Sequence, residues 1–153
     1  MLQRQENGAE FTTGRSRYSD RAPGSREPTA KIFVKIRVEP LGGPILAQLD
    51  TGAAWSMLDA EIAEAMALLS GGGEPARIRT KDGPFAGRLE RASLEIVADE
   101  GEALSFEATV WVSPDWRGGT FLGYAGLLDH IRFAVDPRDD SFHFGPLYPE
   151  AGP

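Results

Sequence analysis

The strongest constraint on the fold is a strict alternation of apolar and charged residues early in the chain. Every second residue from Ile32 to Val38 is apolar, and Lys35 and Arg37 lie between them. A period of two residues is typical of a strand with one face in a core. A turn rich in proline and glycine at 40–44 leads to a second apolar segment, Ile45–Leu49. The two segments therefore predict a β-hairpin.

The rest of the chain continues as short elements between turns. Apolar spacing predicts a helix over 59–69, with Asp59 as its N-cap and Gly71–Gly73 after its end. Gly123 is expected to open a second short helix that runs to His130. We expect a mainly β fold with two short helices. The further strands are predicted over residues 76–80, 87–98, 104–112, 121–122, 131–135 and 142–144, with turns at 81–84, 99–101 and 136–140.

Composition excludes several classes of site and partner. The chain has no cysteine and only two histidines, which rules out disulfides, thiolate metal sites and a histidine-rich metal cage. We expect neither a metal nor a cofactor. The net charge of −7 argues against a general nucleic-acid binder. There is no run of about 18 apolar residues, and the first residues lack the apolar core of a secretory signal. We therefore expect a soluble, cytoplasmic protein without a membrane partner.

The chain is predicted to contain one folded domain with two tails. Residues 1–30 are rich in charge, Gly, Ser, Thr and Pro and lack apolar periodicity, so we expect a flexible N-terminal arm with a short strand near Glu10–Thr13. This arm is either a solvated tail or a segment that packs on a partner subunit. Residues 31–146 form the predicted domain, and residues 147–153 form a C-terminal tail.

A single motif carries chemistry, namely Asp50-Thr51-Gly52-Ala53. Asp50 directly follows the apolar segment 45–49, where a carboxylate loses part of its hydration. The hydroxyl of Thr51 can brace the loop. Gly52 and Ala53 allow a close approach of another backbone that larger side chains would block. The alternative is that Asp50 begins an ordinary turn, because three residues are a weak signal.

A second segment strengthens the interpretation of this motif. Phe121-Leu122-Gly123 follows Asp50 by about seventy positions and leads into the predicted short helix and a final strand. Together, the two segments resemble the retropepsin-like aspartic proteases. In that family an apolar-apolar-Gly segment forms the second leg of a ψ-shaped loop next to the Asp-Thr-Gly-Ala loop. The resemblance covers residues 31–144, about three quarters of the chain. It implies a closed or nearly closed retropepsin-like β-barrel.

The resemblance also implies an activity and an oligomeric state. In this family two carboxylates share one proton and activate a water that attacks a peptide bond. This chain has one Asp-Thr-Gly, so the resemblance implies a homodimer in which each subunit supplies Asp50 as a catalytic residue. Thr51 of each subunit would form a hydrogen bond across the dimer axis. The expected partners are a peptide or protein substrate and a second copy of the chain, and no cofactor is implied.

A flap over the site is implied by the order of segments. The family places a hairpin between the first helix and the ψ-loop segment, and residues 77–89 occupy that place. The expected tip is 81–86, which contains Asp82, Gly83 and Phe85. Glycine at the tip permits opening, and closure excludes water. Phe85 is expected to contact a substrate side chain. The alternative is an ordinary surface hairpin.

Two departures from the family pattern weaken the resemblance. Many members carry an aspartate where this chain has Ala54 and an arginine where it has Tyr124, and in the viral enzymes the two form an ion pair. Losing both partners of a buried pair can be nearly neutral, whereas losing one is costly. We infer that Ala54 and Tyr124, with Trp55, make an apolar contact instead. One alternative function is a catalytically inactive binding or dimerisation module on the same fold. Another is an unrelated small barrel in which Asp50 only ends a strand.

Overall fold

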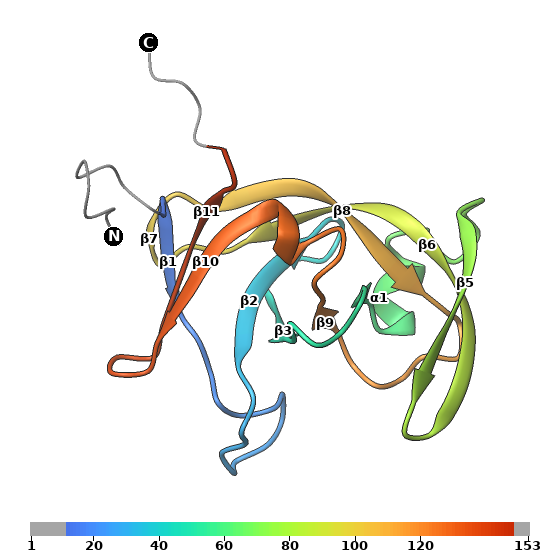
Figure 1. The fold of residues 1–153 in the computed structure, drawn as a ribbon, viewed down its shortest axis with the longest axis horizontal. Helices are drawn as coiled ribbons and strands as arrows, with labels where there is room; N and C mark the ends of the chain where they lie inside the picture. The colour runs from blue at the N-terminus through green and yellow to red at the C-terminus, as the bar shows by residue number, and fades with distance from the viewer. Residues whose placement is uncertain (1–11, 149–153) are drawn as a thin grey trace.

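The fold is mainly β. The computed structural model describes residues 12–148, and of these residues 48% are in strands and 7% in helices. Figure 1 shows a barrel in the middle, a small sheet at one end and a long hairpin at the other. The elements are β1 (Gly14–Arg17), β2 (Phe33–Val38), β3 (Ile45–Leu49), β4 (Ser56–Met57), α1 (Ala60–Ala65), β5 (Glu74–Thr80), β6 (Gly83–Ile96), β7 (Glu100–Gly101), β8 (Leu104–Val112), β9 (Phe121–Leu122), the 3-10 helix η1 (Leu128–His130), β10 (Ile131–Asp136) and β11 (Ser141–Pro146).

Six strands close into the barrel. The larger sheet has the order β2-β3-β9-β4-β8-β6-β5, and an additional pairing between β2 and β6 closes it. Strand β6 is 14 residues long. Its first half pairs with β5, while Leu94 and Ile96 near its end pair with Val38 and Ile36 of β2. Strand β5 therefore lies outside the closed ring, and the prediction of a β-barrel is confirmed.

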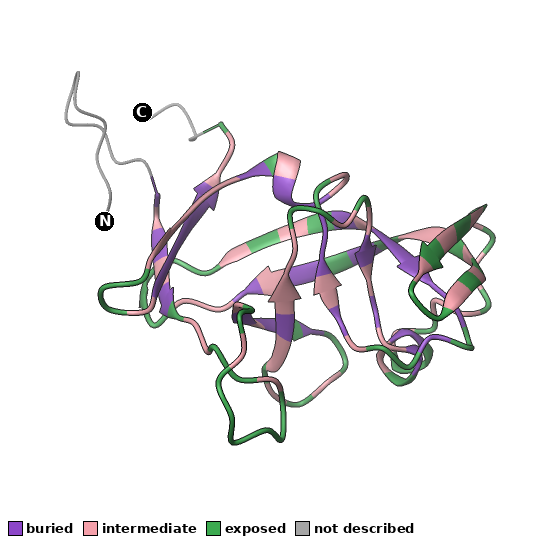
Figure 2. Cartoon of the chain, turned by 60° about the horizontal axis from the view of Figure 1, so that its bottom comes forward, coloured by how far each residue is buried: buried purple, intermediate pink, exposed green. Residues whose placement is uncertain are grey.

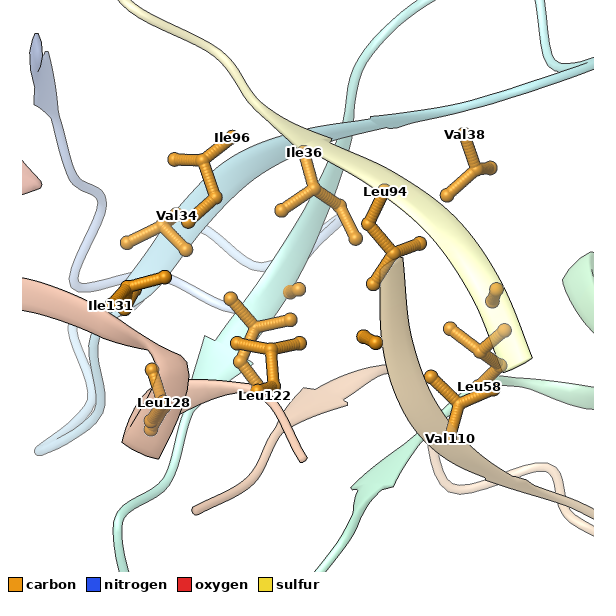
Figure 3. Close-up of a cluster of buried hydrophobic side chains, with 14 of the residues drawn as sticks. Val34, Ile36, Val38, Leu58, Leu94, Ile96, Val110, Leu122, Leu128 and Ile131 are labelled. Atoms are coloured by element: carbon orange, nitrogen blue, oxygen red, sulfur yellow. The ribbon is translucent and has the colours of Figure 1, made fainter. Parts of the chain in front are cut away.

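The core fills the barrel interior. Val34, Ile36 and Val38 are at most 1% exposed and point inward from β2. Figure 3 shows them beside Leu94 and Leu122, which come from β6 and β9. The predicted alternation and the β2–β3 hairpin are confirmed, because one face of β2 lies against this core.

The smaller sheet has the order β10-β11-β1-β7 and corrects the prediction for the N-terminal segment. Residues 14–17 form β1 between β11 and β7, so the prediction of a flexible arm over residues 1–30 is wrong there. Gly14 and Ser16 are buried although neither is a large apolar residue. Because β1 has no apolar side chain, its sequence carries no strand signal. Residues 1–11 and 149–153, which include part of both predicted tails, lie outside the described residues.

Helix α1 is shorter than predicted. The Asp59 carboxylate accepts a hydrogen bond from the Glu61 N–H at 3.0 Å, so the predicted N-cap is confirmed. The helix covers Ala60–Ala65 and ends there, not at residue 69. Ala67 has a φ of 58°, a left-handed conformation that an α-helix cannot include.

The second helix and one turn also differ from the predictions. The helix predicted over 123–130 is reduced to η1, because Gly126 has a left-handed φ of 78° that an α-helix cannot include. The turn predicted at 99–101 contains β7, which pairs with β1. No helix within residues 12–148 is long and apolar enough to cross a membrane.

Candidate active site

The Asp50 loop joins β3 to β4 and is closed by its own hydrogen bonds. The half-buried Asp50 carboxylate accepts a hydrogen bond from the Gly52 N–H at 2.9 Å. The Ala53 N–H donates to the Asp50 carbonyl at 3.2 Å. Asp and Asn readily form this type of local turn. Thr51 and Gly52 are exposed at the apex of the loop.

Strand β9 brings a distant segment to this loop. It lies between β3, to which it is parallel, and β4, to which it is antiparallel. Leu122 pairs with Leu49, and its carbonyl accepts a hydrogen bond from the Asp50 N–H at 3.0 Å. The two segments that the sequence placed in one site are therefore neighbours in space.

Gly123 makes the closest contact between the two segments. A Cβ atom there would lie 2.3 Å from the Trp55 carbonyl, so only glycine fits without a shift of the backbone. The Gly123 N–H donates to the buried Ser56 hydroxyl at 2.9 Å. Sequence reasoning noted the glycine but gave no role to Ser56, which holds β9 against the loop.

The segments that contain the two positions departing from the family pattern, 53–54 and 124–125, are joined by backbone hydrogen bonds. The Tyr124 N–H donates to the Ala53 carbonyl and the Ala125 N–H to the Ala54 carbonyl, both at 2.9 Å. The Tyr124 side chain is 54% exposed, and Ala54 is also exposed. The expected apolar contact between these side chains stays a prediction.

A pocket of about 400 Å³ separates the Asp50 loop from hairpin β5–β6. Asp50 lies two residues before the first residue that lines it. The loop side is mostly apolar, whereas strand β5 contributes two arginines. The lining residues are Gly52, Ala53, Ala54, Trp55, Met57, Arg77, Ile78, Arg79 and Thr80.

The hairpin expected at residues 77–89 is present. Thr80 pairs with Gly83, so the tip is only Lys81 and Asp82 and the expected tip over 81–86 was too long. Gly83 and Phe85 lie in strand β6. The Thr80 hydroxyl accepts a hydrogen bond from the Asp82 N–H at 3.1 Å and donates to the Gly83 carbonyl at 3.2 Å. Gly83 has a φ of 113°, which favours glycine at this position.

Phe85 is half-buried and packs against another aromatic ring. Its ring lies edge-on against Trp116, with the ring centroids 5.5 Å apart. Trp116 also contacts Trp111 at 6.1 Å and Phe121 at 6.2 Å. These aromatic contacts link the hairpin to β9. The sequence did not reveal this connection, because the partners lie far apart in the chain.

No group of three or more potential metal-ligating side chains occurs within residues 12–148.

Comparison with known proteins adds no family, since no family model and no curated protein matches this chain. The chemistry of the site therefore rests on its own geometry and on the motif at Asp50.

Proposed function

We propose that this protein is a retropepsin-like aspartic endopeptidase that works as a homodimer. The observation that carries the proposal is the position of β9 between β3 and β4, next to the Asp50 loop. This arrangement resembles the ψ-shaped loop of that family. A hairpin with an apposed pocket also lies beside the loop, as a flap would.

The number of carboxylates supports a dimer. Catalysis of this type needs two carboxylates that share a proton, and each chain has one Asp-Thr-Gly. Thr51 and Gly52 are exposed at the loop apex, so this part of the loop is accessible to a second subunit. The complete site would contain one Asp50 from each subunit, with Thr51 positioned to bond across the two-fold axis.

The proposed reaction needs only water and the carboxylate pair. The ionised Asp50 takes a proton from the water, whose oxygen forms a bond to the peptide carbonyl carbon. The protonated Asp50 donates its proton to the carbonyl oxygen. As the C–N bond breaks, one carboxyl group of the pair gives its proton to the leaving nitrogen. The other takes a proton from a hydroxyl of the tetrahedral intermediate, which re-forms the carbonyl and restores the shared proton. Because the two groups are coupled, their pH dependence belongs to the pair and not to either residue.

The alternatives differ in what they require of Asp50. An unrelated barrel would not need Asp50 near Phe121–Gly123, and the 3.0 Å bond from its N–H to Leu122 weighs against that reading. A catalytically inactive module on the same fold is favoured by the exposed Tyr124 and by Ala54, which replace the charged residues of many members.

Cleavage of a peptide library tests the proposal. We expect Asp50→Asn to lower the rate by a factor on the order of 100 or more, while Asp115→Asn, an exposed control, retains wild-type activity. Equal cleavage by wild type and Asp50→Asn would refute the proposal. Absence of cleavage by a wild-type dimer would favour the inactive module.

Mixing subunits tests the shared site. Wild-type and Asp50→Asn chains are mixed at constant total protein and allowed to exchange subunits. If each dimer needs two Asp50 carboxylates, activity should fall with the square of the fraction of chains that are wild type. A linear decline would indicate that one chain is sufficient. Sedimentation at micromolar concentration, which reports the mass of the assembly, should give a dimer.

A further inference from the structure

Two arginines line the pocket beside the Asp50 loop. Arg77 and Arg79 are exposed on strand β5, and both belong to the pocket that Gly52–Trp55 lines from the other side. Residues two apart in a strand point to the same side. The two side chains therefore leave β5 on the same side, and both line the pocket next to the Asp50 loop.

Neither arginine has a hydrogen bond or ion pair to another described residue. Several basic residues elsewhere are paired: Arg15 pairs with Glu100 and Asp139, and Arg138 pairs with Asp136. An arginine side chain presents five N–H donors in a planar arrangement that matches a carboxylate. Arg77 and Arg79 thus leave these donors free at the pocket.

The surrounding charge favours an anion at this position. Residues 74–89 contain four basic and two acidic residues, in a chain whose net charge is −7. The other wall of the pocket contains Ala53, Ala54 and Met57, which carry no charge. An apolar wall lowers the local dielectric and strengthens the attraction between a guanidinium and a carboxylate.

We infer that this pocket binds an acidic side chain of the peptide substrate, held by Arg77 and Arg79. The inference rests on the proposed function, since it names the substrate class of the same site. It makes the two arginines specificity-determining residues, because they would contact a substrate side chain and not the scissile bond. The protein would thus prefer peptides with glutamate or aspartate near the cleaved bond.

Retention of peptides by the Asp50→Asn protein tests the inference without catalysis. Two libraries of the same design, one with glutamate and one with glutamine at a fixed central position, are mixed in equal amounts. Retained peptides are counted by mass spectrometry. Near neutral pH and at low salt we expect about fivefold enrichment of the glutamate peptides. The enrichment should disappear at about 1 M salt, where charges are screened beyond about 3 Å.

A matched pair of variants assigns the effect to the pocket. In the Asp50→Asn background, Arg77→Gln with Arg79→Gln should retain both libraries equally. Arg91→Gln with Arg117→Gln removes the same charge from exposed positions that do not line the pocket, and it should keep the enrichment. No enrichment in the parent protein would overturn the inference. Equal loss in both double variants would also overturn it, since net charge alone would then explain the preference.

Cleavage separates this inference from the proposed function. If the wild type cleaves both libraries at equal rates, the enzyme assignment stands and the acidic preference is wrong. If the wild type cleaves neither library but the arginine-dependent enrichment is present, the preference stands and the peptidase assignment fails.

Discussion

Strands β5 and β11 have similar lengths but very different surroundings. No residue of β5 is buried, whereas residues 141–145 of β11 are all buried. Figure 2 shows the difference as exposed and half-buried segments in hairpin β5–β6 and a mostly buried strand in the small sheet at the other end. Strand β5 pairs only with β6, while β11 lies between β10 and β1. Position within the sheets therefore decides how firmly each strand is held.

The charged groups follow the same division. In the small sheet, Arg15 pairs with Glu100 and Asp139, and its side chain is only 30% exposed. The arginines of β5 have no such partners among the described residues. The small sheet uses its charges to connect its own strands, whereas the hairpin presents its charges at the pocket.

The largest expected effect comes from the buried end. Phe142 is fully buried between Phe133 and Phe144. Phe142→Ala should lower the free energy of unfolding by about 3–5 kcal/mol, because it removes packing and leaves a cavity. Urea denaturation measures the change. A loss below about 1 kcal/mol would contradict the claim that this end is firmly packed.

Hydrogen exchange compares the two strands directly. The amides of β5 should open at a free energy about 2 kcal/mol or more below that of β11, since an exposed edge hairpin can open without global unfolding. Residue-resolved exchange under native conditions measures both values. Equal protection of β5 and β11 would mean that the hairpin unfolds only with the whole barrel.

The contact between Phe85 and Trp116 should have an intermediate effect. Phe85→Ala removes a half-buried ring and its edge contact, so we expect a loss of about 1–2 kcal/mol in the free energy of unfolding. Phe85→Leu, which keeps an apolar side chain, should lose less. In the alanine variant β5 should also exchange faster. A variant whose stability changes without faster exchange in β5 would show that Phe85 does not hold the hairpin.

The smallest expected effect is a pH dependence at His143, on β11. Burial lowers the pKa of His143 below its usual 6.5. As the pH falls below about 6.5, His143 is protonated in the unfolded chain before it is protonated in the folded protein. The free energy of unfolding therefore decreases until the pH falls below the pKa of His143 in the folded protein. In the His143→Gln variant, the free energy of unfolding should decrease less between neutrality and about pH 5 than it does in the wild type.

Carboxyl groups change stability in a separate pH range. A hydrogen bond from Arg138 lowers the pKa of Asp136 from 3.8 to about 2. The ionised Asp136 therefore stabilises the folded protein above pH 3.8, and this stabilisation is lost as the pH falls toward 2. If the free energy of unfolding changes near pH 6 by the same amount in wild type and in His143→Gln, His143 is not the cause of that change.

The sequence predicted the elements that carry their own periodic signal. Hairpins β2–β3 and β5–β6 and the final pair β10–β11 were located because their apolar spacing and turns are local. The short strand expected near Glu10–Thr13 was misplaced: β1 lies at Gly14–Arg17, a polar segment that is a strand only through its partners. The helix predicted after Gly123 is only the short η1, because the backbone turns left-handed at Gly126, which the sequence pattern did not show.

The candidate site was predictable in its parts but not in its contacts. The Asp50 motif and Phe121–Gly123 could be found in the sequence, and their resemblance to one family suggested that they meet. The roles of Ser56 and Trp116 could not be found, because each depends on neighbours distant in the chain. The arginines of β5 could not be recognised as candidate substrate contacts from the sequence, because only the structure shows that they line a pocket together with the Asp50 loop.

The position of Trp116 gives the protein an internal optical probe. Its indole lies between Phe85 of the hairpin and Phe121 of β9 and is 8% exposed. Movement of the hairpin away from the barrel would separate Phe85 from this ring and admit water to it. The emission of Trp116, taken as the difference between wild type and Trp116→Phe, would then report movement of the hairpin in real time without an attached dye.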